Sequence, residues 1–220
     1  MHVNNEQIIA IVALPGICIL MYPVFRLLGN KYGKILWNGK NPAWYLGILT
    51  YWIIWCVVFP IVLIGWSRIV VVFELKQIGI ISLLISIFPI VFTFIGRFIL
   101  KFEQVSNNKE QIFIATTAII MGIVEEVLWR GLFIVIFPGD YLWGFIWPSV
   151  WFAIWHLDPG SISILNKWTL ALGALIFGLC WGFVAMQTNS IFWTVISHVS
   201  VGLVRIINIQ EKERPTTNST

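Results

Sequence analysis

Residues 44–66 read WYLGILTYWIIWCVVFPIVLIGW and contain no Asp, Glu, Lys or Arg. A helix needs about 20 apolar residues to cross the hydrocarbon core of a bilayer, and this stretch is long enough. A soluble domain rarely buries so long a segment without a charged residue, because most of its helices keep one face in water. The stretch therefore predicts a membrane-spanning helix and a fold built from such helices.

The rest of the chain repeats this composition. Of its 220 residues 59% are hydrophobic and 11% are charged, whereas a soluble domain has about 25% charged residues. Further apolar runs lie at 7–25, 78–96, 112–137, 141–157, 169–187 and 191–209. We therefore expect an all-α, polytopic transmembrane helix bundle of about seven spans, with eight as the alternative. Little sequence is left for a soluble domain, so any chemistry is expected in or at the lipid bilayer.

The basic charge of the chain is explained by its expected topology. Lys and Arg number 14 against 10 Asp and Glu. With the N-terminus outside, 11 of the 14 basic residues fall on the cytoplasmic side, as the positive-inside rule requires. We therefore expect no nucleic-acid partner. The cysteines Cys18, Cys56 and Cys180 stand singly in apolar runs, which is typical of small buried hydrophobic residues rather than disulfides or metal ligands.

A few ionisable residues interrupt the predicted spans, where a charged side chain costs about 2.5 to 3.5 kcal/mol on insertion scales and indicates function. Glu125, Glu126 and Arg130 lie in the fourth run. Glu126 and Arg130 are four residues apart, so they share a helix face and are expected to form an ion pair. Glu125 is rotated by about 100° from Glu126 and needs a partner from another helix.

Two later runs each carry a histidine. His156 shares a helix face with Ser149 and Phe152, and His198 shares one with Thr194, Gly202 and Arg205. Glu125 and His156 together could take a proton from water, while His198 donates a hydrogen bond to the oxyanion of a peptide bond under attack. Two histidines and one glutamate are also a known catalytic zinc set, so zinc held by Glu125, His156 and His198 stays open.

These residues lie in motifs that resemble the CAAX protease and bacteriocin-processing family, also called CPBP or Abi. Residues 125–131 read EEVLWRG and resemble the E-E-x-x-x-R motif of the family. Residues 152–156 read FAIWH and resemble its F-x-x-x-H motif. Residues 189–198, from Asn-Ser-Ile-Phe-Trp to Ser-His, resemble its third segment, a short turn before a helix with a histidine.

The resemblance implies an intramembrane endopeptidase of the bacterial cytoplasmic membrane, of the bacteriocin-processing or self-immunity type. Its substrate would be a peptide or protein terminus in or at the membrane, and it would need no cofactor. It implies that Glu125 and His156 activate water, that Glu126, Arg130 and Phe152 support the site, and that His198 helps to form the oxyanion hole. We expect N-terminal helices at 1–110, a catalytic bundle at 111–209 and a disordered polar tail at 210–220.

One position departs from the family pattern. The family usually has Asn or Asp four residues after the last histidine, and here that residue is Gly202. One missing oxyanion donor lowers the rate by about 10²- to 10³-fold in a well-studied protease. Gly202 therefore leaves open a slow enzyme, or a non-catalytic immunity or regulatory protein with the same fold. A proton-coupled carrier is a third alternative, but no inverted repeat is evident.

Overall fold

The computed structural model describes residues 4–31, 47–100, 108–157 and 164–204. All regular elements in these ranges are helical, which confirms the predicted all-α fold. The first half holds α1 (Asn5–Lys31), η1 (Tyr51–Val58), α3 (Phe59–Ile64), α4 (Trp66–Val71) and α5 (Ile80–Leu100). The second half holds α6 (Asn108–Glu126), η2 (Val127–Gly131), α7 (Leu132–Ile136), η3 (Leu142–Ile146), α8 (Trp147–Trp155), α9 (Ile164–Thr188) and α10 (Phe192–Val204). The elements η1, η2 and η3 are π-helical. The predicted tail at 210–220 lies outside the described residues.

Within the described ranges, two helices are long and apolar enough to cross a membrane. They run over Gly47–Ile64 and Trp168–Thr188. Shorter apolar helices occur at Asn5–Met21, Ile80–Gly96, Leu142–Trp155 and Phe192–Val204. Six of the seven expected apolar runs coincide with these helices. The run at 112–137 is helical but is not among them, and the count of seven spans stays a prediction.

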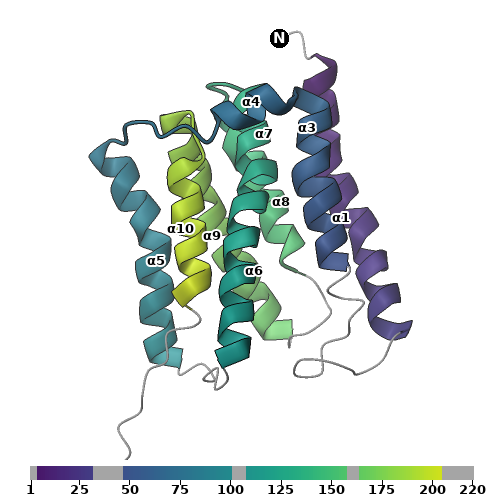
Figure 1. Cartoon of the computed structure of the whole chain (residues 1–220), viewed down its shortest axis with the longest axis vertical. Coiled ribbons are helices and arrows are strands. Elements are labelled where there is room, and N and C mark those ends of the chain that lie inside the picture. Colours follow the sequence, from purple (N-terminus) through teal and green to yellow (C-terminus); the bar gives the residue numbers. More distant parts are fainter. Residues whose placement is uncertain (1–3, 32–46, 101–107, 158–163, 205–220) are drawn as a thin grey trace, which may run out of the picture.

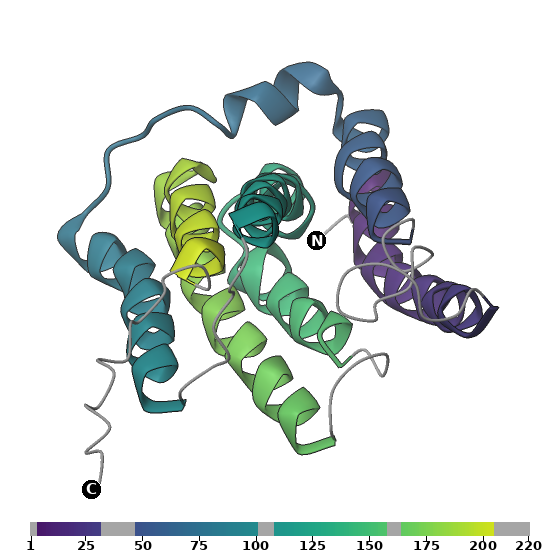
Figure 2. The same cartoon turned by 60° about the horizontal axis from the view of Figure 1, so that its bottom comes forward.

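The helices are arranged with the second half of the chain at the centre (Figures 1 and 2). Helices α1 and α3 lie at one edge and α5 lies at the opposite edge. Residues 66–79 cross from one edge to the other over one end of the molecule. Helix α1 packs on α7 and α8, and α5 packs on α9 and α10. The motif-bearing helices are consequently enclosed between two layers contributed by the first half.

The crossing segment is fastened to the turn between α9 and α10. The Ile191 amide donates to the Val72 carbonyl at 2.8 Å, and the Ser190 hydroxyl donates to the carbonyls of Val72 and Glu74 at 3.0 and 2.7 Å. The Trp193 indole donates to the Lys76 carbonyl at 2.9 Å. These bonds satisfy backbone carbonyls that a non-helical segment would otherwise leave unpaired.

Helix α9 approaches both η3 and α8 closely because it presents small residues on one face. A Cβ built on Gly182 would lie 2.7 Å from Cβ of Phe145, and one on Gly178 would lie 3.2 Å from Cβ of Ser149. Glycine at these positions lets the backbones meet, as in other closely packed membrane helices.

Tryptophans of η3 and α8 form a stripe that packs toward α1. Rings of Trp143, Trp147 and Trp151 meet edge to face in sequence, with centroids 5.2 and 5.7 Å apart. The Trp147 indole donates to the Ile11 carbonyl of α1 at 3.2 Å. This stripe is therefore part of the packing that holds α1 against the central helices.

Candidate active site

The two adjacent glutamates lie at a change of helix type. Glu125 and Glu126 end α6, and Arg130 lies in the π-helical segment η2 that follows. In η2 the Leu132 amide donates to the carbonyl of Val127, five residues earlier. Such single π-helical turns are rare inside helices and occur frequently at functional sites.

Glu126 and Arg130 form the predicted ion pair. Nη1 of Arg130 lies 3.0 Å from Oε1 of Glu126, and the two residues are 1% and 0% exposed. Two full charges at this depth must be paired, since an unpaired buried charge costs several kcal/mol. The same Glu126 oxygen also lies 2.8 Å from Nδ1 of His198.

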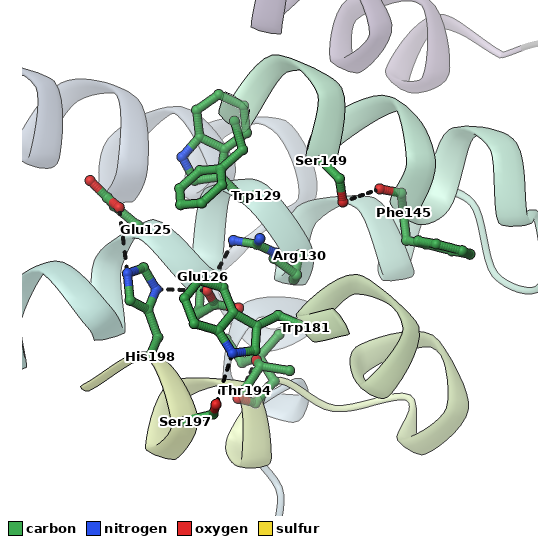
Figure 3. A network of polar contacts seen from close by, with 12 residues as sticks. Glu125, Glu126, Trp129, Arg130, Phe145, Ser149, Trp181, Thr194, Ser197 and His198 are labelled. Atoms are coloured by element: carbon green, nitrogen blue, oxygen red, sulfur yellow. Dashed lines mark hydrogen bonds and ion pairs between the residues drawn. The ribbon is translucent and has the colours of Figure 1, made fainter. Parts of the chain in front are cut away.

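Glu125 finds its partner in α10. Oε2 of Glu125 lies 4.0 Å from Nε2 of His198, and both side chains are buried. Figure 3 shows the imidazole between the two carboxylates, with one ring nitrogen facing each. The sequence predicted that Glu125 needs a partner from another helix, and the structure identifies that partner as His198. It did not predict that Glu126 also reaches the same ring.

The protons on His198 follow from these contacts. A carboxylate only accepts hydrogen bonds, so Nδ1 donates its hydrogen to Glu126, an assignment made from the network. In a neutral ring Nε2 would then present a lone pair toward Glu125. In a protonated ring both nitrogens donate, and His198 and Arg130 balance the charges of Glu125 and Glu126. With the ring protonated, the two positive groups and the two negative groups sum to zero charge.

His156 lies at the C-terminal end of α8 and is half-buried. Its Nδ1 lies 2.7 Å from the Phe152 carbonyl, so Nδ1 carries the hydrogen and Nε2 of a neutral ring is an acceptor. The Phe152 ring contacts both imidazoles, with centroids 4.5 Å from His156 and 6.1 Å from His198. Phe152 therefore lies in contact with both of the histidines that the sequence predicted for the site.

The described residues contain no group of three or more His, Cys, Asp or Glu side chains placed to hold a metal ion. Glu125, His156 and His198 therefore do not converge as a zinc-ligand set in this arrangement. The donor types suit zinc, but the geometry does not fit the metal-dependent alternative.

A comparison with family models identifies the segment that carries this site. Residues 107–204, just under half of the chain, match the family described as type II CAAX prenyl endopeptidase Rce1-like. Over this segment the chain is similar to the Rce1-like CAAX protease family. The match includes all three motifs recognised in the sequence and confirms the resemblance to CAAX proteases. No curated protein and no solved structure matches the chain.

Aromatic rings pack against the His198 imidazole and the Arg130 guanidinium. The Trp181 indole of α9 stacks on the His198 imidazole, with centroids 4.3 Å apart and planes inclined by 19°. The Arg130 guanidinium lies 4.6 Å from the Phe152 centroid and 5.2 Å from that of Trp181. Cation–π contacts of this kind partly replace the lost hydration of a buried guanidinium. Sequence reasoning missed Trp181, which is one of 13 tryptophans and lies in no motif.

Residues from the first half of the chain also pack against the site, although this half lies outside the match to the Rce1-like family. Segment η1 packs on η2 and on α6. The Tyr51 hydroxyl accepts a hydrogen bond from the Trp129 indole at 2.8 Å, and the Tyr51 ring stacks on Trp155 at 4.3 Å. Trp52 Nε1 and Glu125 Oε2 are buried polar atoms without a hydrogen-bond partner. Unsatisfied buried groups are rare in folded proteins, and a catalytic role is one of the reasons for which they occur.

Gly202, the departure from the family pattern, lies where α10 touches α6. A Cβ at Gly202 would lie 2.6 Å from Cβ of Ala118. One turn away, a Cβ at Gly122 would lie 2.6 Å from Cγ2 of Val199. The two helices are thus too close for a side chain at position 202 while Ala118 is present. The missing Asn or Asp is therefore coupled to the packing of α6 against α10.

Proposed function

We propose that this chain is an intramembrane endopeptidase that hydrolyses a peptide bond by water activated directly by protein side chains. The observation that carries the proposal is the buried arrangement in which Glu125 and Glu126 face the two nitrogens of one imidazole. A carboxylate and a hydrogen-bond donor lie side by side there, in surroundings of low polarity. General-base catalysis and oxyanion stabilisation need this combination.

The proposed reaction uses Glu125 as the base. Glu125 takes a proton from water as the water oxygen bonds to the carbonyl carbon of the substrate. The oxyanion that forms accepts a hydrogen bond from Nε2 of protonated His198. The C–N bond then breaks, and the proton held by Glu125 passes to the departing nitrogen. Peptide and water are converted to a carboxylic acid and an amine, with no covalent enzyme intermediate.

His156 is proposed to share in water activation. Its Nδ1 donates to the Phe152 carbonyl, which leaves Nε2 as the nitrogen that can accept a proton. Phe152 supports this role because it contacts both imidazoles. Glu126 and Arg130 support the site by fixing Nδ1 of His198 and by neutralising each other.

The proposed substrate is a peptide or a protein terminus held in or at the bilayer. The family description names prenyl endopeptidases, and the many exposed large hydrophobic side chains support a site in or at the bilayer. Within this class we propose a bacterial enzyme of the bacteriocin-processing or self-immunity type. Catalysis is proposed to need no metal, because Glu125 and His156 are proposed to activate water directly.

The test is cleavage by purified protein reconstituted in lipid vesicles. The substrates are a mixed set of leader peptides, hydrophobic peptides and farnesylated C-terminal peptides, with products read by mass spectrometry. Wild type and Glu125→Gln are compared with and without a zinc chelator. Products from wild type alone, with the chelator present, support the proposal. Products that disappear with the chelator support the zinc alternative instead.

The second candidate is a non-catalytic immunity or regulatory protein with the Rce1-like fold. The observation that favours it is the contact of Gly202 with Ala118, because no oxyanion donor fits at that position. Folded wild-type protein that cleaves none of the peptides, but binds one of them, would favour this candidate.

A further inference from the structure

The ring of His198 is held by a tryptophan that no motif includes. The Trp181 indole is 2% exposed and lies nearly parallel to the imidazole, at a centroid distance of 4.3 Å. A parallel ring at this distance leaves no room for the imidazole to turn about its Cβ–Cγ bond. The contact therefore restricts the plane of the imidazole, which a single hydrogen bond to Glu126 does not do.

Trp181 is itself held in place by a relay of two hydrogen bonds that reaches two other helices. Its Nε1 donates to the Ser197 hydroxyl at 2.8 Å, and that hydroxyl donates to the Ser86 carbonyl of α5 at 2.5 Å. Figure 3 shows the indole between Arg130 and His198, with Ser197 below it. All the atoms in this relay belong to buried residues. The relay joins α9, α10 and α5, so the indole cannot shift without breaking a buried hydrogen bond.

The orientation of His198 matters because both of its nitrogens have a partner. Nδ1 lies 2.8 Å from Glu126 and Nε2 lies 4.0 Å from Glu125. Rotation of the ring about its Cβ–Cγ bond moves both nitrogens, so it changes the Nδ1 contact with Glu126 and the Nε2 contact with Glu125 together. Misplacement of a reacting group by about 1 Å can cost about 10²-fold in rate.

We propose that Trp181 is a positioning residue that fixes the plane of His198, and that Ser197 acts with it. The inference rests on the proposed function for its effect on rate, but its effect on the imidazole is independent of any activity. Trp181 touches no reacting atom, so its contribution is expected in kcat and not in KM.

The variants separate the stack from the hydrogen bond. Trp181→Phe keeps an aromatic ring but loses the donor to Ser197, and Ser197→Ala loses the acceptor and keeps the indole. Trp181→Leu removes both. Trp147→Phe is the matched control, since it also removes an indole hydrogen bond but on the α1 side of α8. We expect kcat to fall by about 10²-fold in Trp181→Leu and by less in Trp181→Phe, with KM unchanged.

The second readout is ¹⁵N NMR of histidine-labelled protein in detergent. The chain has only three histidines, and the His198 signals are assigned by their loss in His198→Gln. Wild type and Trp147→Phe are expected to show one set of His198 signals with a protonated Nδ1. Trp181→Leu is expected to show exchange-broadened or averaged signals, and Trp181→Phe and Ser197→Ala intermediate ones.

Unchanged His198 signals in Trp181→Phe, Ser197→Ala and Trp181→Leu would overturn the inference. If Trp181→Leu does not fold, the two conservative variants decide the question. Altered signals in a protein that cleaves no peptide would support the positioning of His198 and refute the proposed function. Altered signals with unchanged kcat in an active enzyme would refute the role of Trp181 in catalysis.

Discussion

Oε1 of Glu126 lies 2.8 Å from Nδ1 of His198, although the two residues are separated by 72 positions in the chain. The same oxygen accepts from Arg130 at 3.0 Å. Glu126 is therefore shared between a guanidinium in its own helix and an imidazole in α10. The contact brings the first and third family motifs together inside the protein.

Removal of Glu126 is expected to destabilise the fold. Glu126→Gln leaves Arg130 buried without a counter-charge, and breaking a buried pair costs about 3 to 5 kcal/mol. The double variant Glu126→Gln with Arg130→Met removes both charges and is expected to recover much of the loss. Thermal unfolding in detergent measures both. A single variant as stable as wild type would contradict the ion-pair interpretation.

Glu125→Gln is expected to abolish peptide hydrolysis and to cost less stability than Glu126→Gln, because Arg130 keeps Glu126 as its counter-charge. Oε2 of Glu125 has no hydrogen-bond partner, so the amide replaces no bond at that atom. The amide cannot accept a proton from water, so the rate is expected to fall to background. The assay is peptide cleavage in vesicles, with unfolding temperature measured on the same preparation. Full activity in Glu125→Gln would remove the proposed base.

Tyr51→Phe tests whether the first half of the chain supports the site. The substitution removes the acceptor of the buried Trp129 indole, and an unsatisfied buried donor costs about 1 to 3 kcal/mol. Tyr141→Phe is the control, since its hydroxyl accepts from Gln187 at the surface. Denaturation in mixed micelles is expected to show a loss for Tyr51→Phe and almost none for the control. Equal effects would show that the Tyr51 hydroxyl contributes nothing specific.

Much of this architecture could be predicted from the sequence, because apolar composition and helical spacing are local properties. The absence of charge in residues 44–66 predicted a helix, and the spacing of Glu126 and Arg130 predicted their ion pair. Both depend on neighbours within one helix. The motifs also predicted the family, since their order and spacing do not require knowledge of the fold.

Contacts between helices could not be predicted, because no sequence spacing sets them. The approach of His198 to both glutamates, the stack of Trp181 and the packing of Tyr51 against the site each depend on how separate helices pack. Glu125 illustrates the difference between what the sequence can and cannot predict. Its need for a partner followed from burial, but the choice of His198 followed only from the position of α10.

The close packing of α10 on α6 explains why Gly202 stands where the family usually has Asn or Asp. Gly202→Asn alone places a Cβ 2.6 Å from Cβ of Ala118, and so it is expected to push α10 from α6 and to lower stability. Ala118→Gly with Gly202→Asn makes room for the side chain. If the missing oxyanion donor limits the rate, the double variant is expected to fold and to cleave about 10²-fold faster than wild type. Cleavage rate and unfolding temperature are measured for both variants and for Ala118→Gly. A stable double variant with no gain in rate would indicate that another group already stabilises the oxyanion.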